Sequence, residues 1–193
     1  MSGAPAAAEP RPRRAALPEG GPFAEGFRSV FDAELAYVCH SLRRLGVREG
    51  DLEDVAQDLF VAVHARFSEY DRARPIRPWL FSFACRVAAN YRRLARHRRE
   101  VARPDADEGA TSLPDPEQSA ERSEKRELLL EALETIDFDR RAAFIMHDLD
   151  GFTAAQIAEV VGAPENTIHS RVRLARIEMK QAVLAIRRRG GLA

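Results

Sequence analysis

The chain has 193 residues, of which 45% are apolar, so it can form one medium or two small domains with packed cores. No apolar run reaches the roughly 18 residues that a membrane span requires, and the N-terminus lacks the apolar centre of a secretory signal. These features predict a cytoplasmic protein without membrane insertion. Cys39 and Cys85 alone cannot make the usual four-ligand structural zinc site and are expected to be buried thiols.

Charge is unevenly distributed along the chain, although its 30 basic and 30 acidic residues balance. Residues 71–103 hold ten arginines against two acidic residues, and residues 140–193 hold nine basic against five acidic ones. Between them, residues 104–139 hold twelve acidic against three basic residues. Two basic segments around an acidic one indicate modules that bind a polyanion, joined by a spacer that repels it. Ordinary solvated faces are the alternative interpretation.

The periodic stretches of the first half are helical. Apolar spacing predicts a helix over Phe27–Leu45 that ends at Gly46, and a second helix that opens at Asp51 as its N-cap. No alternating run rich in Val, Ile and Thr indicates a strand. The preceding tail, residues 1–22, is rich in Ala, Pro and Arg and is expected to be disordered.

A loop rich in Pro and Arg, Ser68–Arg77, precedes the clearest helix of the chain. This helix starts from Pro78, whose missing N–H costs nothing in a first turn. Its apolar face follows the i, i+3, i+4 rule and consists of Trp79, Leu80, Phe83, Ala84, Val87, Ala88 and Tyr91. We interpret the aromatic residues of this face chiefly as core. The arginines lie off the face, and like charges at i, i+4 destabilise a helix that has no anionic partner.

The helical pattern breaks down over residues 101–123, where prolines and acids predict a flexible acidic linker. Helical periodicity then returns and continues to residue 189. The expected fold is therefore all-α, with two small helical domains over residues 23–100 and 124–189.

Residues 153–180 contain the helix-start and helix-end signals that are typical of a helix-turn-helix. Thr153 and Gln156 form a capping-box pattern, Gly162 is placed to end the short helix, and Pro164 starts the next one. The inner face of that second helix repeats apolar residues, which are Ile168, Val172, Ala175 and Met179. The opposite face carries Arg, Asn and small polar residues, the types that contact bases and phosphates in the major groove. A helical hairpin with a solvated face is the alternative.

The stretch from Gly151 to Arg176 closely resembles region 4 of extracytoplasmic-function (ECF) sigma factors, a subfamily of the sigma-70 family. The matching motifs are Gly151-Phe152-Thr153, Ile157-Ala158-Glu159, Gly162-Ala163-Pro164 and Thr167-Ile168-His169-Ser170-Arg171. The resemblance implies that the second helix recognises the −35 element of a promoter. The implied DNA-contacting residues are Glu165, Asn166, Thr167, His169, Ser170, Arg171, Arg173 and Arg176.

Residues 51–60 resemble region 2.2 of the same family, with its Asp-x-x-Gln-acid-x-Phe core. In the family this stretch docks on the clamp helices of the largest polymerase subunit. The resemblance implies Asp54, Gln57, Asp58 and Phe60 as polymerase-binding residues, and the first three share one helix face by their spacing. Stabilisation of a helix start by acidic residues is the alternative reading of this stripe.

Residues 79–93 resemble regions 2.3–2.4 of the family, with Trp-Leu-aromatic followed by a late arginine cluster. This resemblance implies capture and melting of the −10 element, with a base flipped into the preceding loop. The implied residues are Arg74, Arg77, Arg86, Asn90 and Arg93.

The two resemblances cover roughly residues 23–99 and 125–188, in the order of the family. They imply a sigma factor, not an enzyme, that binds core RNA polymerase and directs initiation at specific promoters. The expected partners are polymerase, promoter DNA and an anti-sigma factor, without a cofactor or metal. A helix-turn-helix regulator that acts without polymerase is the alternative. The five histidines lack metal-ligand spacing, which disfavours a metalloenzyme.

Overall fold

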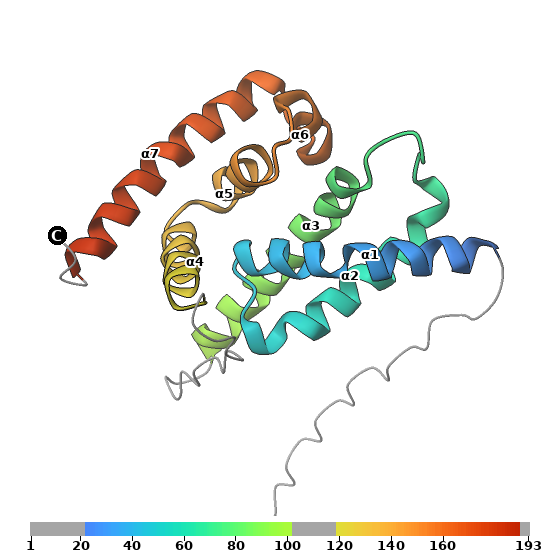
Figure 1. Cartoon of the computed structure of the whole chain (residues 1–193), viewed down its shortest axis with the longest axis horizontal. Helices are drawn as coiled ribbons and strands as arrows, with labels where there is room; N and C mark the ends of the chain where they lie inside the picture. Colours follow the sequence, from blue (N-terminus) through green and yellow to red (C-terminus); the bar gives the residue numbers. More distant parts are fainter. Residues whose placement is uncertain (1–21, 102–118, 190–193) are drawn as a thin grey trace, which may run out of the picture.

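The computed structural model describes residues 22–101 and 119–189, which are helical and contain no strand within those ranges (Figure 1). We call residues 22–101 the N-terminal segment and residues 119–189 the C-terminal segment. Of the expected tail and linker, residues 1–21 and 102–118 lie outside the described ranges. No helix of the described segments is long and apolar enough to span a membrane.

Three long helices build the N-terminal segment, and each packs on the other two. They are α1 (Pro22–Arg44), α2 (Leu52–Arg66) and α3 (Ile76–Val101), with the 3-10 turns η1 (Glu49–Asp51) and η2 (Phe67–Glu69) on either side of α2. The apolar face of α2 is buried between the other two helices, with Leu59 and Val63 fully enclosed. Because all three helices bury one apolar stripe, their polar faces remain on the outside.

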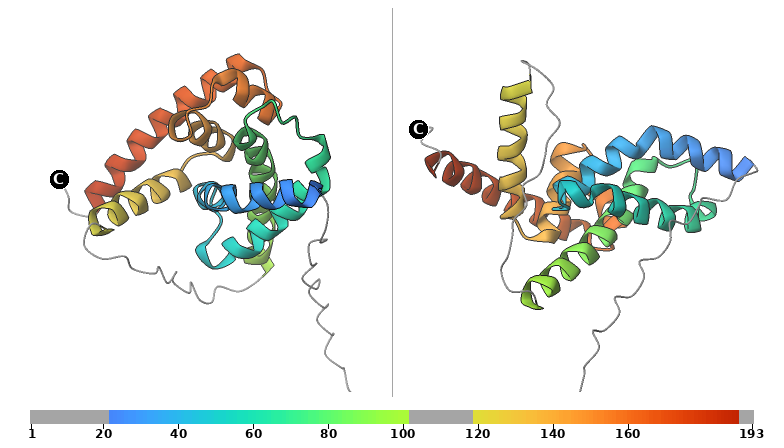
Figure 2. Two further views of the ribbon diagram at one scale, coloured as in Figure 1. Left: turned by 45° about the vertical axis from the view of Figure 1, so that its right-hand side comes forward. Right: turned by 90° about the horizontal axis from the view of Figure 1, so that it is seen from below.

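The C-terminal segment is organised around one long helix. Its elements are α4 (Ser119–Glu134), α5 (Phe138–Phe144), the π-helical turn η3 (Ile145–Leu149), α6 (Ala154–Val161) and α7 (Glu165–Arg189). The long helix α7 contacts α4, α5 and α6 along its length, and the left view of Figure 2 shows these three helices on one side of it. This packing leaves one face of α7 on the outside of the molecule.

Two helices end in the same left-handed glycine turn. Gly46 follows α1 with φ of 96°, and the N–H of Val47 donates to the carbonyl of Leu42 at 3.0 Å. Gly162 follows α6 with φ of 66°, and the N–H of the next residue donates back into α6 at 3.1 Å. Left-handed backbone is strained for residues with a Cβ, so glycine is favoured at both places. The predicted helix ends at these glycines are confirmed.

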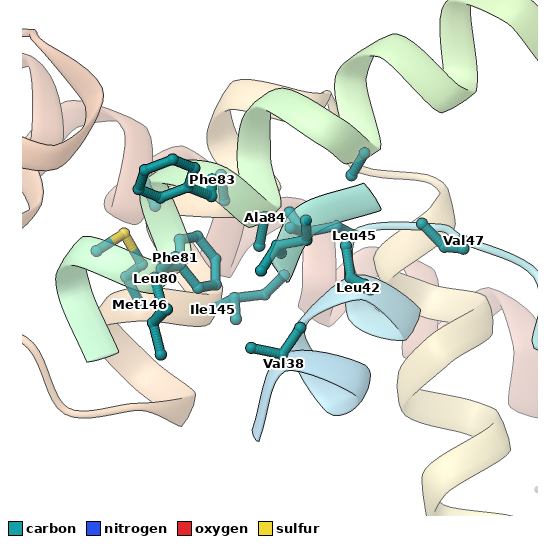
Figure 3. Close-up of a cluster of buried hydrophobic side chains, with 14 of the residues drawn as sticks. Val38, Leu42, Leu45, Val47, Leu80, Phe81, Phe83, Ala84, Ile145 and Met146 are labelled. Atoms are coloured by element: carbon teal, nitrogen blue, oxygen red, sulfur yellow. The ribbon is translucent and has the colours of Figure 1, made fainter. Parts of the chain in front are cut away.

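The two segments share one hydrophobic cluster (Figure 3). Ile145 and Met146 of η3 are fully buried, and they lie against apolar residues of α1 and α3. The labelled partners from the N-terminal segment are Val38 and Leu42 on α1, Leu45 and Val47 just after it, and Leu80, Phe81, Phe83 and Ala84 on α3. Within the described residues, most of the buried apolar side chains therefore belong to one cluster that crosses from one segment to the other.

Some helix starts differ from those expected. The helix expected from Pro78 begins two residues earlier, at Ile76. A proline is tolerated there because the first four N–H groups of a helix have no partner within it. Likewise, α4 begins at Ser119, inside the range 101–123 in which a linker was expected. Both cysteines, which were expected to be buried thiols, are half-buried.

Asp51 occupies the N-cap position of α2 but does not cap it. Its backbone lies outside the extended region that a capping residue adopts, and its side chain forms no cap hydrogen bond. Instead, the carboxylate accepts a hydrogen bond from the hydroxyl of Tyr91 on α3, at 2.6 Å. The expected capping role of Asp51 is therefore wrong. The carboxylate binds Tyr91 of another helix in place of the backbone of α2.

Candidate nucleic-acid interface

The start of α6 is fixed by the predicted capping box. The hydroxyl of Thr153 accepts the N–H of Gln156 at 3.3 Å, and the amide oxygen of Gln156 accepts the N–H of Thr153 at 2.9 Å. After the turn at Gly162, the carbonyl of Pro164 accepts the N–H of Thr167 at 2.9 Å and opens α7. Local hydrogen bonds thus set the angle between the two helices of the motif.

The outer face of α7 presents the residues that were expected to contact the −35 element. Six of them are exposed, which are Glu165, Asn166, His169, Ser170, Arg173 and Arg176, whereas Thr167 and Arg171 are half-buried. On the inner face, Ile168, Val172 and Ala175 are buried, and Met179 packs against the same cluster. The helix is thus anchored by its apolar face, and its polar face is left exposed.

Two arginines of this face already have acidic partners. Arg176 forms a two-pronged contact with Asp148 of η3, with N–O distances of 2.8 and 2.7 Å. Arg171 donates to Asp139 of α5 at 2.7 Å. The hydrogen bonds from Arg176 hold the pKa of Asp148 below its usual range. Arg173, by contrast, is exposed and forms no ion pair with another residue that the structure describes.

The acidic stripe expected on α2 lies on the outside of the N-terminal segment. Asp54 and Asp58 are exposed and Gln57 is half-buried, so the three side chains are open to a partner. Phe60 differs, because only 2% of it is exposed and its ring packs edge-on against Phe31 with centroids 4.6 Å apart. Phe60 is therefore a core residue in this structure, and it is not exposed as the three polar residues are. It anchors α2 in the core and so positions the stripe.

The residues expected at the −10 element lie along α3 and the loop before it. Arg86, Asn90 and Arg93 are exposed at helical spacing on one face of α3. Arg86 lies over the ring of Phe83, 4.6 Å from its centroid, and Arg93 donates to Asn90 at 3.0 Å. These contacts within the helix hold the guanidinium groups along its polar face.

Two further arginines of that set are held by partners from other helices. Arg77 donates to Glu34 of α1 at 2.9 Å, and its guanidinium lies 4.9 Å from the ring centroid of Tyr37. Arg74 pairs with Glu159 of α6, which belongs to the C-terminal segment. The structure thus brings a predicted −10 residue into contact with the helix-turn-helix.

A groove of about 980 Å³ lies between α3 with its preceding loop on one side and α5 and α6 on the other. Trp79, Ser82 and Arg86 line one wall, and Glu159 and Gly162 line the other. Phe83 is core, as expected, but Trp79 and Tyr91 are only half-buried. Trp79 packs on the rings of Tyr70 and Phe83, 5.0 and 4.8 Å from their centroids, and offers an aromatic surface to the groove.

Sequence reasoning missed the polar contacts that join the two segments. The hydroxyl of Tyr37 donates to Asp150 at 2.9 Å, and Arg44 donates to the other carboxylate oxygen at 3.1 Å. Nothing in the spacing of residues more than 100 positions apart could have indicated these pairs. Among the described residues, no group of three or more His, Cys, Asp or Glu side chains is placed to hold a metal ion.

Comparison with known proteins gives the family. The model described as Sigma-70 region 2 matches residues 30–99, and the model described as Sigma-70, region 4 matches residues 126–179. RNA polymerase sigma factor NccH of Alcaligenes xylosoxydans xylosoxydans is 27% identical over 145 residues, which are 74% of this chain and 78% of that protein. The ECF RNA polymerase sigma-E factor of Escherichia coli K12 is 26% identical over 176 residues, 86% of this chain and 92% of the relative.

Two solved structures share the fold. CnrH, determined in complex with the cytosolic domain of CnrY, superposes with a TM-score of 0.61 at 23% identity, covering 84% of this chain and 90% of CnrH. The sigma factor RpoE of Bartonella quintana, determined with the anti-sigma factor NepR, gives a TM-score of 0.60 at 21% identity, covering 82% and 97% of the two chains. With both sigma-70 regions matched in order, the chain belongs to the sigma-70 family, as a sigma factor of the ECF type.

Proposed function

We propose that this chain binds core RNA polymerase and directs promoter-specific initiation, with α7 at the −35 element and α3 with its preceding loop at the −10 element. The observation that carries the proposal is the presence, on one chain, of an open acidic stripe on α2 and an open basic face on α7. A regulator that only binds DNA needs the second feature but not the first. The chain itself supplies no catalytic group, because the polymerase forms the phosphodiester bonds.

At the −35 element, the first turns of α7 enter the major groove. Asn166, His169 and Ser170 face the base edges, where amide and hydroxyl groups can discriminate between base pairs. Arg173 and Arg176 lie further along the same face and reach phosphates, which fix the position of the helix but carry no sequence information. The N-terminal end of α7 adds the positive end of a helix dipole.

At the −10 element, the polar face of α3 follows the backbone of the separated strand. Arg86 and Arg93 supply the positive charge, and Trp79 and Tyr70 supply aromatic surface on which an unpaired base can stack. These contacts form only with the separated strand. Their binding energy therefore favours the melted promoter over the closed duplex.

Docking on polymerase uses the acidic stripe of α2. We expect the variant Asp54→Arg with Asp58→Arg to fold normally but to lose co-elution with purified bacterial core polymerase, because two exposed acids become cations facing a basic partner. The matched control is Asp32→Arg with Glu124→Arg, two exposed acids on α1 and α4. Retention of the first variant by polymerase would remove α2 from the docking surface.

An anti-sigma factor is the expected regulator. The B. quintana relative was determined with the anti-sigma factor NepR, and CnrH with the cytosolic domain of CnrY. A function on chromosomal promoters also places this chain in the cytoplasm. Both points extend from the relatives to this chain as part of the proposal.

A further inference from the structure

Asp51 forms a distant hydrogen bond in place of a local one. It stands directly before α2, where an aspartate side chain commonly accepts a free N–H of the first turn, yet it forms no such bond. Its carboxylate instead accepts the hydroxyl of Tyr91 on α3 at 2.6 Å, across 40 positions of the chain. A residue that departs from its local preference in this way is expected where function needs the longer contact.

The hydrogen bond to Tyr91 lies at the point where α3 leaves the core. Among the described side chains of α3, Ala88 is the last that is buried, and Tyr91 is half-buried. From there to residue 97 the side chains are exposed or half-buried. Burial, together with the bond to Asp51, raises the pKa of the Tyr91 hydroxyl, so the hydroxyl remains a donor at neutral pH. Apolar packing therefore holds the first half of α3, whereas polar contacts of Tyr91 hold the part beyond it.

This contact joins two surfaces to which the proposed function assigns different partners. The exposed polar face of α3, here called the −10 face, carries Asn90 and Arg93 on either side of Tyr91, and Arg93 donates to Asn90 at 3.0 Å. On α2, the acidic stripe begins at Asp54, three positions after Asp51. A change in the contact between Asp51 and Tyr91 would therefore move one surface relative to the other.

We propose that Asp51 and Tyr91 are positioning residues, whose hydrogen bond fixes the −10 face of α3 relative to the acidic stripe of α2. This inference rests on the proposed function for the roles of the two surfaces. When polymerase holds α2, the bond places Asn90 and Arg93 where the separated strand passes. Such preorganisation strengthens binding because side chains that must be ordered on binding subtract from the affinity. Both positioning residues act through their neighbours and not by contact with DNA.

Three substitutions separate positioning from stability. Tyr91→Phe removes the hydroxyl and keeps the ring, whereas Asp51→Ser removes the distant acceptor and leaves a side chain that can cap α2. Asp51→Asn keeps an oxygen that can accept from Tyr91, so it should retain most of the wild-type behaviour. The matched control is Tyr37→Phe, which removes the hydroxyl of another tyrosine–aspartate pair, that with Asp150 at 2.9 Å.

Amide hydrogen exchange of the full chain and promoter melting with core polymerase measure the two parts of the inference. We expect Tyr91→Phe and Asp51→Ser to speed exchange at residues 90–97 by roughly three- to tenfold, the effect of one lost hydrogen bond. On a promoter found by run-off transcription with the wild-type chain, both variants should lower the permanganate reactivity of melted thymines and keep normal co-elution with polymerase. Tyr37→Phe should change neither exchange at these residues nor melting.

Equal exchange at residues 90–97 in the wild type, Tyr91→Phe and Asp51→Ser would overturn the inference, and so would undiminished melting by the two variants. Equal melting defects in Tyr91→Phe and Tyr37→Phe would overturn it as well, because a general loss of stability would then explain both. The exchange measurement needs neither polymerase nor a promoter. A wild-type chain that yields no transcript with core polymerase would instead overturn the proposed function.

Discussion

At the residue scale, several cations that we expect to meet phosphate already have carboxylate partners. Arg171 and Arg176 pair with Asp139 and Asp148, and Arg74 pairs with Glu159. DNA binding is then partly an exchange of partners, in which a phosphate replaces a carboxylate. Such an exchange lowers the net gain from each contact, but it also holds the long side chains near the positions in which they are needed.

The Asp148–Arg176 pair has a defined pH dependence. Because the hydrogen bonds from Arg176 lower the pKa of Asp148, the pair contributes stability that is present above the ordinary aspartate pKa of about 3.9 and is lost as the pH falls through the lowered value. Carboxyl NMR of the folded chain should show Asp148 titrating below an ordinary aspartate. The pKa should rise in Arg176→Ala and stay in place in Arg173→Ala. An unchanged pKa in Arg176→Ala would refute the pairing.

At the scale of elements, a capping box and a glycine turn decide where α7 lies. The capping box at Thr153 and the turn at Gly162 fix both ends of α6, so α7 leaves the turn in one direction. Gly162 has no neighbour within 4 Å of the place that a Cβ would occupy. Glycine is therefore favoured at this position by the left-handed backbone conformation and not by a lack of space for a side chain.

Gly162→Ala tests this requirement. We expect a loss of about 1 to 2 kcal/mol in the free energy of unfolding, because a Cβ disfavours the left-handed turn. Gly50→Ala is the matched control, since a Cβ there also meets nothing within 4 Å and the backbone is not left-handed. It should be neutral or slightly stabilising. Chemical denaturation measures both, and equal effects would rule out backbone strain at Gly162.

The features that could be predicted from the sequence are those that depend on residues close together in the chain. The capping box, the glycine turns and the apolar face of α7 arise from neighbours within a few residues, and the structure confirms them. Asp51 was misread because Tyr91, 40 positions away, takes its carboxylate. Phe60 was named as a contact because the family motif contains it, although burial makes it a core residue here. The contacts of Asp150 come from tertiary packing and have no local signature.

At the scale of the whole molecule, a net charge of zero hides two basic surfaces. The acidic residues of the middle of the chain balance the arginines in number, but the outer faces of α3 and α7 remain rich in arginine. Electrostatic binding depends on this local distribution and not on the total. The chain should therefore bind DNA with the salt dependence of a basic protein.

Arg173→Ala measures one contact of this kind. If Arg173 meets a phosphate, its removal should weaken binding to a duplex of mixed sequence and reduce the slope of log K against log salt by about 0.9. Lys180→Ala, a change of an exposed cation further along α7, is the control and should keep the slope. Fluorescence anisotropy over a salt series gives the slopes. A slope unaltered by Arg173→Ala would place that side chain away from the backbone of the duplex.

The most direct measurement of the central claim is run-off transcription with purified bacterial core polymerase on a pool of genomic promoter fragments, with and without this chain. The account predicts new, specific transcripts that depend on the chain, disappear with Asp54→Arg plus Asp58→Arg, and persist with the control Asp32→Arg plus Glu124→Arg. Their start sites would also supply the promoter sequence. A chain that binds duplex DNA but yields no polymerase-dependent transcript would contradict the account and favour a regulator that acts without polymerase.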